Sequence, residues 1–191
     1  MVALVCGVGV NDRSCPAKVN GKHTKEYSIW RSMLYRCYDI RILDTHPTYA
    51  LCAVSGDFKY YHLFHKWCQR QIGFNTEDYD LDKDLLIKGN KLYSEDNCVF
   101  IPRSINSLLT KREILRGKYP IGVRLLGNRY QARCRANGEK CLGTYDTPEL
   151  AFQAYKTFKE AYIKEQAELY KDSIDPRAYL ALLNYEVSIN D

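Results

Sequence analysis

The clearest periodic pattern in this sequence lies in its last third, where apolar and polar residues alternate. In the segment RYQARCRA the apolar positions are Tyr130, Ala132, Cys134 and Ala136. The intervening positions are Arg129, Gln131, Arg133 and Arg135. A period of two over eight residues predicts a half-buried strand with one basic face. The preceding segment predicts a second strand, with Ile121, Val123 and Leu125 on one face and Arg124 on the other.

Asn137-Gly138 marks a hairpin turn whose length fixes the register of a third strand. A two-residue loop would set Leu142 opposite Arg133. A three-residue loop with Gly138 in the left-handed conformation sets Leu142 opposite Ala132, so that apolar meets apolar. We choose the second register. It leaves Arg129, Arg133, Arg135 and Cys141 on one open face.

A helix is predicted after this sheet, because Thr147 is a good N-cap and Pro148 suits the first helical position. Its apolar stripe, which could cover the apolar face of the sheet, comprises Ala151, Ala154, Tyr155, Phe158, Ala161 and Tyr162. Asp175-Pro176 predicts a shorter terminal helix that runs through Asn184.

Two amphipathic helices are predicted in the first half of the chain. The first carries the apolar positions Tyr27, Trp30, Met33, Leu34 and Cys37, and the second carries Tyr60, Leu63, Phe64 and Trp67. The opposite face of the second helix presents His62, His65 and Gln69. The two histidines could hold a metal ion, but a plain polar helix face is the reading we favour.

Oxygen-bearing side chains gather in the segment LDKDLLIKGNKLYSEDNCVF: Asp82, Asp84, Asn90 and Asn97. Such side chains suit Mg²⁺. Ser94, followed by Glu95, Asp96 and Asn97, indicates the start of a short helix. Taken alone, the pattern fits an ordinary surface loop better than a cation site.

Composition narrows the class of protein. The 191 residues contain no apolar run near the roughly 20 residues of a membrane span. The apolar opening has no charged segment before it and is interrupted by Gly7 and Gly9, so we expect no signal peptide and a cytoplasmic protein. Eight cysteines occur without any C-x-x-C spacing, which favours small buried thiols over disulfides or zinc.

The positive charge is concentrated rather than spread. The chain carries +5 overall, but residues 103–140 hold ten Lys/Arg against two acids, which is +8 there and −3 elsewhere. Such concentration is typical of a phosphate-binding surface. A solvated linker helix would account for Lys111 to Lys118, and a wet sheet face is the alternative for the arginines.

The C-terminal segment IGVRLLGNRYQARCRANGEKCLGTYDTPELAFQAYKTFKEA resembles the Apetala/ERF-type DNA-binding domain, in which a three-stranded sheet lies in the major groove. The resemblance rests on GVR, the alternating second strand and LGTYDTPE with AFQAY. It implies that Arg124, Arg129, Arg133 and Arg135 contact DNA. Plant members carry a tryptophan where this chain has Cys141, so their base preference is not transferred.

The order YSIWRSMLYRCY, PTY, FKYYHLFHKW and LDKD–GNK–YSEDNCVF resembles phage-encoded HNH endonucleases of the homing type, many of which carry an Apetala-type domain after the nuclease. The resemblance implies a ββα-metal fold in which Asp82 and Asn97 bind the metal. Lys83 stands where the family places its water-activating histidine. A lysine between two aspartates keeps its proton and is a poor base, although it could stabilise phosphate charge. His62 or His65 could substitute as the base.

These observations predict an α+β protein with a ββα-metal (HNH-like) module, residues 1–110, and a basic linker, 111–118. An Apetala/ERF-type domain, 119–170, and a helical extension, 171–191, follow. The expected function is metal-dependent cleavage of double-stranded DNA, with Mg²⁺ or Mn²⁺ held by Asp82, Asn97 and Asp84. The DNA-binding residues would be Arg124, Arg129, Arg133 and Arg135, with Lys111 and Arg112 from the linker. The alternatives are an inactive DNA-binding protein that acts by occupancy, and an inhibitor of a host protein.

Overall fold

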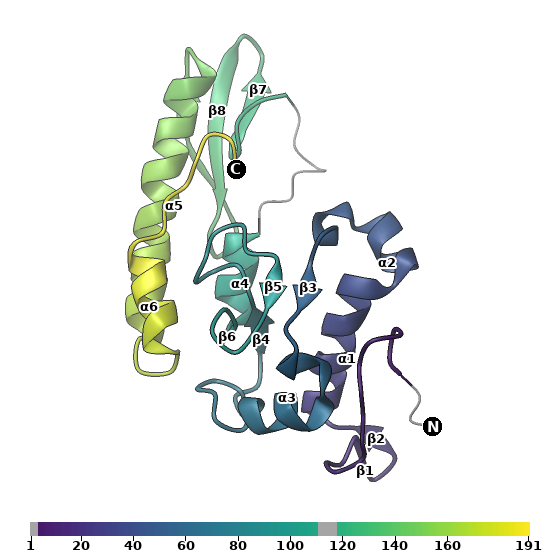
Figure 1. Ribbon diagram of the computed structural model, residues 1–191. Coiled ribbons are helices and arrows are strands. Elements are labelled where there is room, and N and C mark those ends of the chain that lie inside the picture. The colour runs from purple at the N-terminus through teal and green to yellow at the C-terminus, as the bar shows by residue number, and fades with distance from the viewer. Residues whose placement is uncertain (1–3, 111–117) are drawn as a thin grey trace. The chain divides into compact units, whose positions relative to one another are not determined.

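The chain folds into two units. The computed structural model describes residues 4–110 and 118–191. It divides into unit 1, Met1–Ile101, and unit 2, Pro102–Asp191 (Figure 1). The mixed α+β class is confirmed. The predicted boundary at residue 110 placed the helix Arg103–Leu109 (α4) with the N-terminal module, whereas this helix is part of unit 2.

Unit 1 is built on two helices that pack through aromatic side chains. Helix α1, Lys25–Tyr38, begins at Thr24, whose hydroxyl accepts a hydrogen bond from Tyr27 N. Its buried face is the predicted one: Trp30, Met33, Leu34 and Cys37. Helix α3, Tyr61–Cys68, buries Tyr61, Phe64, Trp67 and Cys68. Tyr60 was expected in that stripe but is 44% exposed, because it lies before the first turn of the helix.

Short elements complete unit 1. They are β1 (Lys18–Val19), β2 (Lys22–His23), α2 (Ile40–Thr45), η1 (Pro47–Tyr49), β3 (Ala53–Val54), η2 (Asp57–Lys59), β4 (Tyr79–Asp82), β5 (Leu92–Tyr93) and β6 (Val99–Pro102). Strands β1 and β2 are antiparallel, β3 pairs with β5 in parallel, and β4 pairs with β6. The segment from Asp82 to Asn97 thus starts at the end of β4, passes through β5 and ends just before β6.

The predicted helix start at Ser94 is wrong. Residues Glu95–Asn97 form a single turn, in which Cys98 N donates to Ser94 O at 3.1 Å. The chain then enters β6, whose four residues are all buried. Burial of this apolar strand outweighs the local capping signal, and the next helix is α4.

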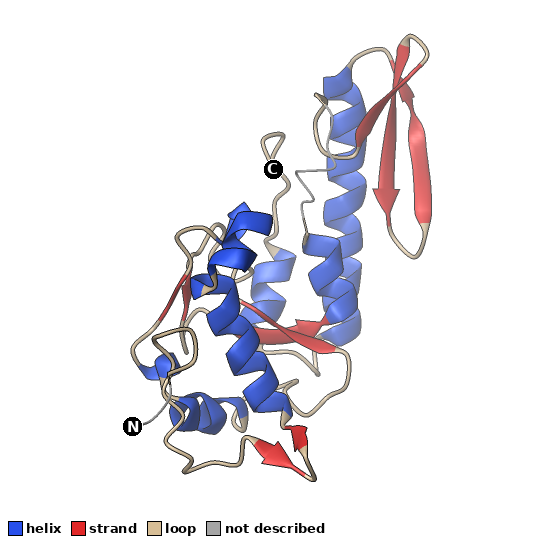
Figure 2. Cartoon of the chain, turned by 90° about the vertical axis from the view of Figure 1, so that its right-hand side faces the viewer, coloured by secondary structure: helices blue, strands red, loops and turns tan. Residues whose placement is uncertain are grey.

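Unit 2 contains the predicted three-stranded antiparallel sheet, formed by β7 (Val123–Leu126), β8 (Arg129–Arg135) and β9 (Glu139–Tyr145). Helix α5, Pro148–Tyr170, runs along one face of it (Figure 2). Thr147 caps α5 by accepting from Leu150 N at 3.2 Å. Helix α6, Pro176–Leu183, follows and is capped by Asp175. Both caps are as predicted.

The register of the sheet agrees with the predicted loop length and departs from it at one position. Arg135 pairs with Glu139 around a three-residue loop, and Gly138 has φ +101°. Arg133 pairs with Cys141, but Ala132 pairs with Gly143. Leu142 is therefore an extra residue at a β-bulge instead of the partner of Ala132. It still packs against the core.

The core of unit 2 lies between the sheet and α5 and includes the C-terminal segment. Cys134, Phe152, Tyr155 and Val187 form its buried centre. Val187 is held at both backbone groups, since its N donates to Glu160 Oε1 and its O accepts from Lys156 Nζ, each at 2.8 Å. The predicted helix stripe is correct for Ala151 and Tyr155. It is wrong at Ala161, which is exposed, because the second half of α5 buries Ile163 and Ala167 instead.

The eight cysteines are all free thiols. Five are buried, as expected for most of them: Cys37, Cys52, Cys68, Cys98 and Cys134. Cys6 and Cys15 are half-buried, and Cys141 is exposed. None of the helices in the described part of the chain combines the length and apolar composition of a membrane span.

Candidate functional site

The four predicted DNA-contacting arginines lie on one face of the β7–β9 sheet. On β8, Ala132 and Cys134 are buried beneath α5, so the alternating Arg129, Arg133 and Arg135 lie on the opposite face. Arg124 of β7 joins them, because it pairs with Gln131 and donates to its Oε1 at 2.9 Å. This set is the arginine face. Its arrangement follows from the period-two pattern and the strand register.

Acidic residues border the arginine face. Arg133 forms an ion pair with Glu139, and Arg129 Nε lies 2.9 Å from Asp146 Oδ1. Both acids come from β9 or the residue that follows it, which the strand pattern of β8 could not reveal. Arg135 has no ion-pair partner among the described residues and is exposed. Within the described part of the chain, Arg124 and Arg135 are thus the arginines of this face that form no ion pair.

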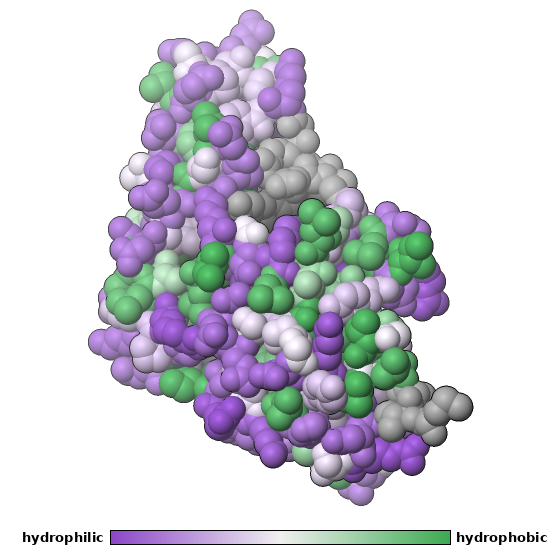
Figure 3. Space-filling view, in the orientation of Figure 1, coloured by the Kyte–Doolittle hydropathy of each residue, from purple (hydrophilic) through white to green (hydrophobic). Residues whose placement is uncertain are grey.

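The two basic linker residues, Lys111 and Arg112, lie outside the described residues. On the side of the molecule seen in Figure 3, exposed hydrophobic groups are interspersed with hydrophilic ones.

Asp82 ends β4, as predicted, and its carboxylate begins the loop that follows. Oδ1 accepts from Asp84 N at 2.8 Å and from Leu85 N at 2.7 Å. Burial raises the pKa of Asp82, and the Asp84 charge adds to this, while the two backbone hydrogen bonds and Lys83 lower it. By exposed area Asp82 is half-buried, and a partly desolvated carboxylate with a raised pKa is a feature of functional sites.

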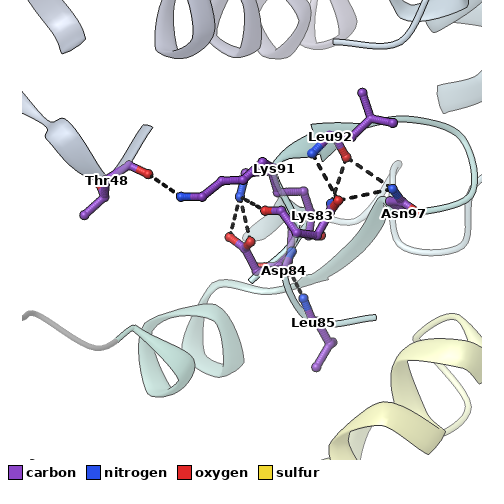
Figure 4. Close-up of polar contacts among 9 residues, drawn as sticks. Thr48, Lys83, Asp84, Leu85, Lys91, Leu92 and Asn97 are labelled. Atoms are coloured by element: carbon purple, nitrogen blue, oxygen red, sulfur yellow. Dashed lines mark hydrogen bonds and ion pairs between the residues drawn. The ribbon is translucent and has the colours of Figure 1, made fainter. Parts of the chain in front are cut away.

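Lys83 is turned into the loop rather than toward solvent. Its side chain is 6% exposed, and Nζ donates to both oxygens of Asp84, at 2.6 and 2.7 Å (Figure 4). Nζ also donates to Asn90 O at 2.9 Å and lies 5.6 Å from the centre of the Tyr93 ring. All three ammonium hydrogens can be satisfied by these oxygens. Lys83 is thus a buried side chain whose ammonium is engaged by Asp84 and Asn90.

Asn97 lies in the turn before β6, not at the start of a helix as expected. Its Nδ2 donates to Asn90 Oδ1 at 3.3 Å and to Leu92 O at 3.5 Å. Asn90 is the centre of this network: its Nδ2 donates to Lys83 O and to Leu92 O, both at 2.8 Å. Asn90 was considered only as a cation ligand, but it closes the loop from Lys83 to Leu92.

His62 and His65 face carboxylates from the N-terminal part of unit 1. His62 Nδ1 lies 2.9 Å from Asp12 Oδ2, although the angle between the two groups does not make a hydrogen bond. His65 Nε2 lies 3.9 Å from Glu26 Oε1, an oxygen that also accepts from Gln69 Nε2 at 2.5 Å. In the described residues, no hydrogen bond or ion pair joins either histidine to Asp82 or Asn97. The structure gives no support for either as a base there.

The predicted oxygen ligands fit a divalent cation only in part. Oδ2 of Asp82 accepts no hydrogen bond from the described residues, and neither does the side-chain oxygen of Asn97. Asp84, in contrast, gives both oxygens to Lys83. No group of three His, Cys, Asp or Glu side chains suited to a metal ion occurs in residues 4–110 or 118–191. Asp84 could join a cation site only after Lys83 released it.

Further residues around this loop were missed at the sequence level. Tyr93 is buried beside Arg36 of α1, and burial raises its pKa although Arg36 lowers it. Lys91 Nζ donates to Thr48 O at 2.9 Å, which ties the loop to η1 (Figure 4). Neither Tyr93 nor Lys91 stands out in the sequence, because each is a single polar residue whose partner lies far away in the chain, 43 positions in the case of Lys91.

Loss of charge at Asp82 and at Asp84 should change the stability of the protein in opposite directions. Asp82→Asn is expected to raise the free energy of unfolding at pH 7 by on the order of 1 kcal/mol, because it removes a partly desolvated charge while an amide oxygen still accepts both backbone hydrogen bonds. Asp84→Asn should lower it by about 1–3 kcal/mol, because Lys83 would keep a buried, unpaired ammonium.

The pH dependence follows from the raised pKa of Asp82. The cost of its burial is fully present above the pKa in the folded protein and fades as pH falls toward the ordinary value of 3.8. Urea denaturation of Asp82→Asn between pH 7 and pH 4, followed by fluorescence, should therefore show a gain in stability that shrinks as pH falls. A loss of stability at pH 7 would show that the Asp82 charge is stabilised in the fold.

Comparison with known proteins does not assign this chain: no family model matches it, and neither the curated proteins nor the solved structures gave a match.

Proposed function

We propose that this protein binds double-stranded DNA through the arginine face of the β7–β9 sheet. The observation that carries the proposal is the strand register, which gathers Arg124, Arg129, Arg133 and Arg135 on the face that α5 leaves uncovered. A β-sheet of this size suits the major groove, and arginines bind phosphates and guanine edges. The DNA phosphates would replace Glu139 and Asp146 as partners of Arg133 and Arg129.

The proposal predicts a strongly salt-dependent affinity. If four arginines each neutralise one phosphate, the slope of log K against log salt is roughly −3 to −4. Fluorescence anisotropy of the full chain with a labelled duplex at ~50 to ~200 mM salt measures this slope. An affinity that does not change with salt would reject the proposal and favour the protein–protein alternative.

A second candidate function is cleavage of the bound DNA by unit 1, as in an HNH endonuclease of the homing type. Two observations favour it: the half-buried Asp82 carboxylate, which has one oxygen free of hydrogen bonds to described residues, and the pairing of β4, which ends at Asp82, with β6. The ion pair between Lys83 and Asp84 favours the other form of the proposal, in which the protein acts by occupying its site.

A plasmid-nicking assay with Mg²⁺, with Mn²⁺ and with EDTA separates the two forms. The comparison is wild type against Asp82→Ala and Asn97→Ala. Metal-dependent nicking that both substitutions abolish would support cleavage at this loop. Nicking that survives both substitutions would mean a different centre, and absence of nicking alongside salt-sensitive binding would support occupancy.

A further inference from the structure

The ammonium group of Lys83 is surrounded by oxygens in the way that a bound cation would be. Asp84 Oδ1, Asp84 Oδ2 and Asn90 O lie 2.6, 2.7 and 2.9 Å from Nζ (Figure 4). The Lys83 side chain is 6% exposed, whereas that of Asp84 is 55% exposed. Carboxylate and backbone carbonyl oxygens are also the ligands that hard divalent cations prefer. The oxygen cage is therefore one that either kind of cation could fill.

The same contacts close the loop from Lys83 to Asn90. Lys83 Nζ donates to Asn90 O, and Asn90 Nδ2 donates back to Lys83 O at 2.8 Å. The two residues thus bind each other through side chain and backbone in both directions. The ring of the buried Tyr93 faces the ammonium in a cation–π contact, 5.6 Å from Nζ to the ring centre. These contacts link the two ends of the loop.

We propose that Lys83 is the built-in cation of this loop: it occupies the cation site formed by Asp84 and Asn90, and it thereby keeps Asp84 from binding a divalent ion. The inference goes beyond DNA binding and does not rest on it. It also accounts for the disagreement between the predicted metal ligands and the structure. Removal of the ammonium would leave the Asp84 carboxylate and the Asn90 carbonyl without their partner. Together with the Asp82 carboxylate, two positions earlier in the chain, these oxygens would form a latent divalent-cation site.

Mn²⁺ binding to the full chain, followed by loss of the EPR signal of the free ion, tests this directly. Asp84→Asn in the wild-type background should leave Mn²⁺ affinity unchanged. Lys83→Met, which keeps the length of the side chain without its charge, should bind Mn²⁺ at least about tenfold more tightly than wild type. The double variant Lys83→Met/Asp84→Asn should lose that gain. Lys83→Arg, which keeps the positive charge, should behave as wild type.

Two results would overturn the proposal: weaker Mn²⁺ binding by Asp84→Asn than by wild type, or a folded Lys83→Met variant with no gain. If Lys83→Met does not fold, limited proteolysis of the wild type decides. Cleavage within residues 83–90 should proceed at the same rate in EDTA and in Mn²⁺, and protection by Mn²⁺ would show that a metal, not Lys83, orders the loop. DNA affinity measured on the same samples reports on the arginine face independently.

Discussion

The double variant Arg133→Ala/Arg135→Ala is expected to bind duplex DNA about 10- to 100-fold more weakly than wild type at low salt. Both residues lie on the arginine face, and Arg135 has no carboxylate partner among the described residues. Each lost phosphate contact should also reduce the salt slope by about 0.9, so the slope of the double variant should be shallower by roughly 2. Anisotropy titrations at several salt concentrations measure both quantities.

Two further variants give this experiment its controls. Lys164→Ala removes an exposed positive charge from α5, away from the arginine face, and should change affinity little. Glu139→Gln should have the opposite effect to the double variant, because it removes a negative charge and frees Arg133 from its ion pair. An increase of a few fold in affinity is expected. If Lys164→Ala, which removes one charge, lost half as much binding free energy as the double variant, which removes two, only net charge would matter.

Cys141 provides a second readout of where DNA binds. It is exposed and pairs with Arg133 in the sheet register, so it lies on the arginine face. DNA bound there should slow alkylation of Cys141. The buried thiols are shielded from the reagent, and burial also raises the pKa of Cys37 and of Cys98 to about 12. Tight binding without protection of Cys141 would place DNA elsewhere on the molecule.

Gly122→Ala is expected to destabilise unit 2 by about 3–5 kcal/mol. Gly122 has φ +78°, and a Cβ there would overlap the Cγ and Cδ2 atoms of Tyr155, a buried residue of α5. Its carbonyl accepts from Arg133 N at 2.8 Å, so the backbone cannot move away without loss of a sheet hydrogen bond. Both the backbone conformation and the close approach of sheet to helix require glycine here.

Gly127→Ala is the matched control for this variant. Gly127 has φ +61°, but no atom lies within 4 Å of the position of its Cβ, so only the conformational cost of about 1 kcal/mol is expected. Both tryptophans, Trp30 and Trp67, are in unit 1, so the tryptophan fluorescence transition in urea should be unchanged in either variant. Circular dichroism should show the loss in unit 2. Equal effects of the two substitutions would show that the contact with Tyr155 is dispensable.

Local pattern predicted those parts of the fold in which one periodicity dominates. The strand β8 follows from its alternation, since a one-residue shift would bury its arginines. The caps Thr147 and Asp175 were also found, because capping depends on residues within three positions. In α3 the stripe was misplaced at Tyr60, since backbone hydrogen bonds link Val10 to Lys59 and Tyr61 and hold Tyr60 outside the helix. No local pattern contains such a contact.

The candidate site was predicted less completely than the fold. The position of Asp82 at a strand end was correct, but the side-chain directions of Lys83 and Asp84 depend on Asn90 and Tyr93, which the fold brings together. Likewise, Glu139 and Asp146 reach arginines of β8 from another strand. A sequence shows which charges are present. Which charges are already paired is a property of the folded chain.

The bulge at Leu142 has a consequence for the shape of the arginine face. A β-bulge increases the local right-handed twist of a sheet, and this one falls between Ala132 and Arg133. It therefore turns the half that carries Arg133 and Arg135 relative to the half that carries Arg124 and Arg129. A flat anionic surface would meet one half at a time, whereas the curved wall of a groove can follow both. For the proposed DNA partner, the inserted residue would thus bring both halves of the arginine face against one groove.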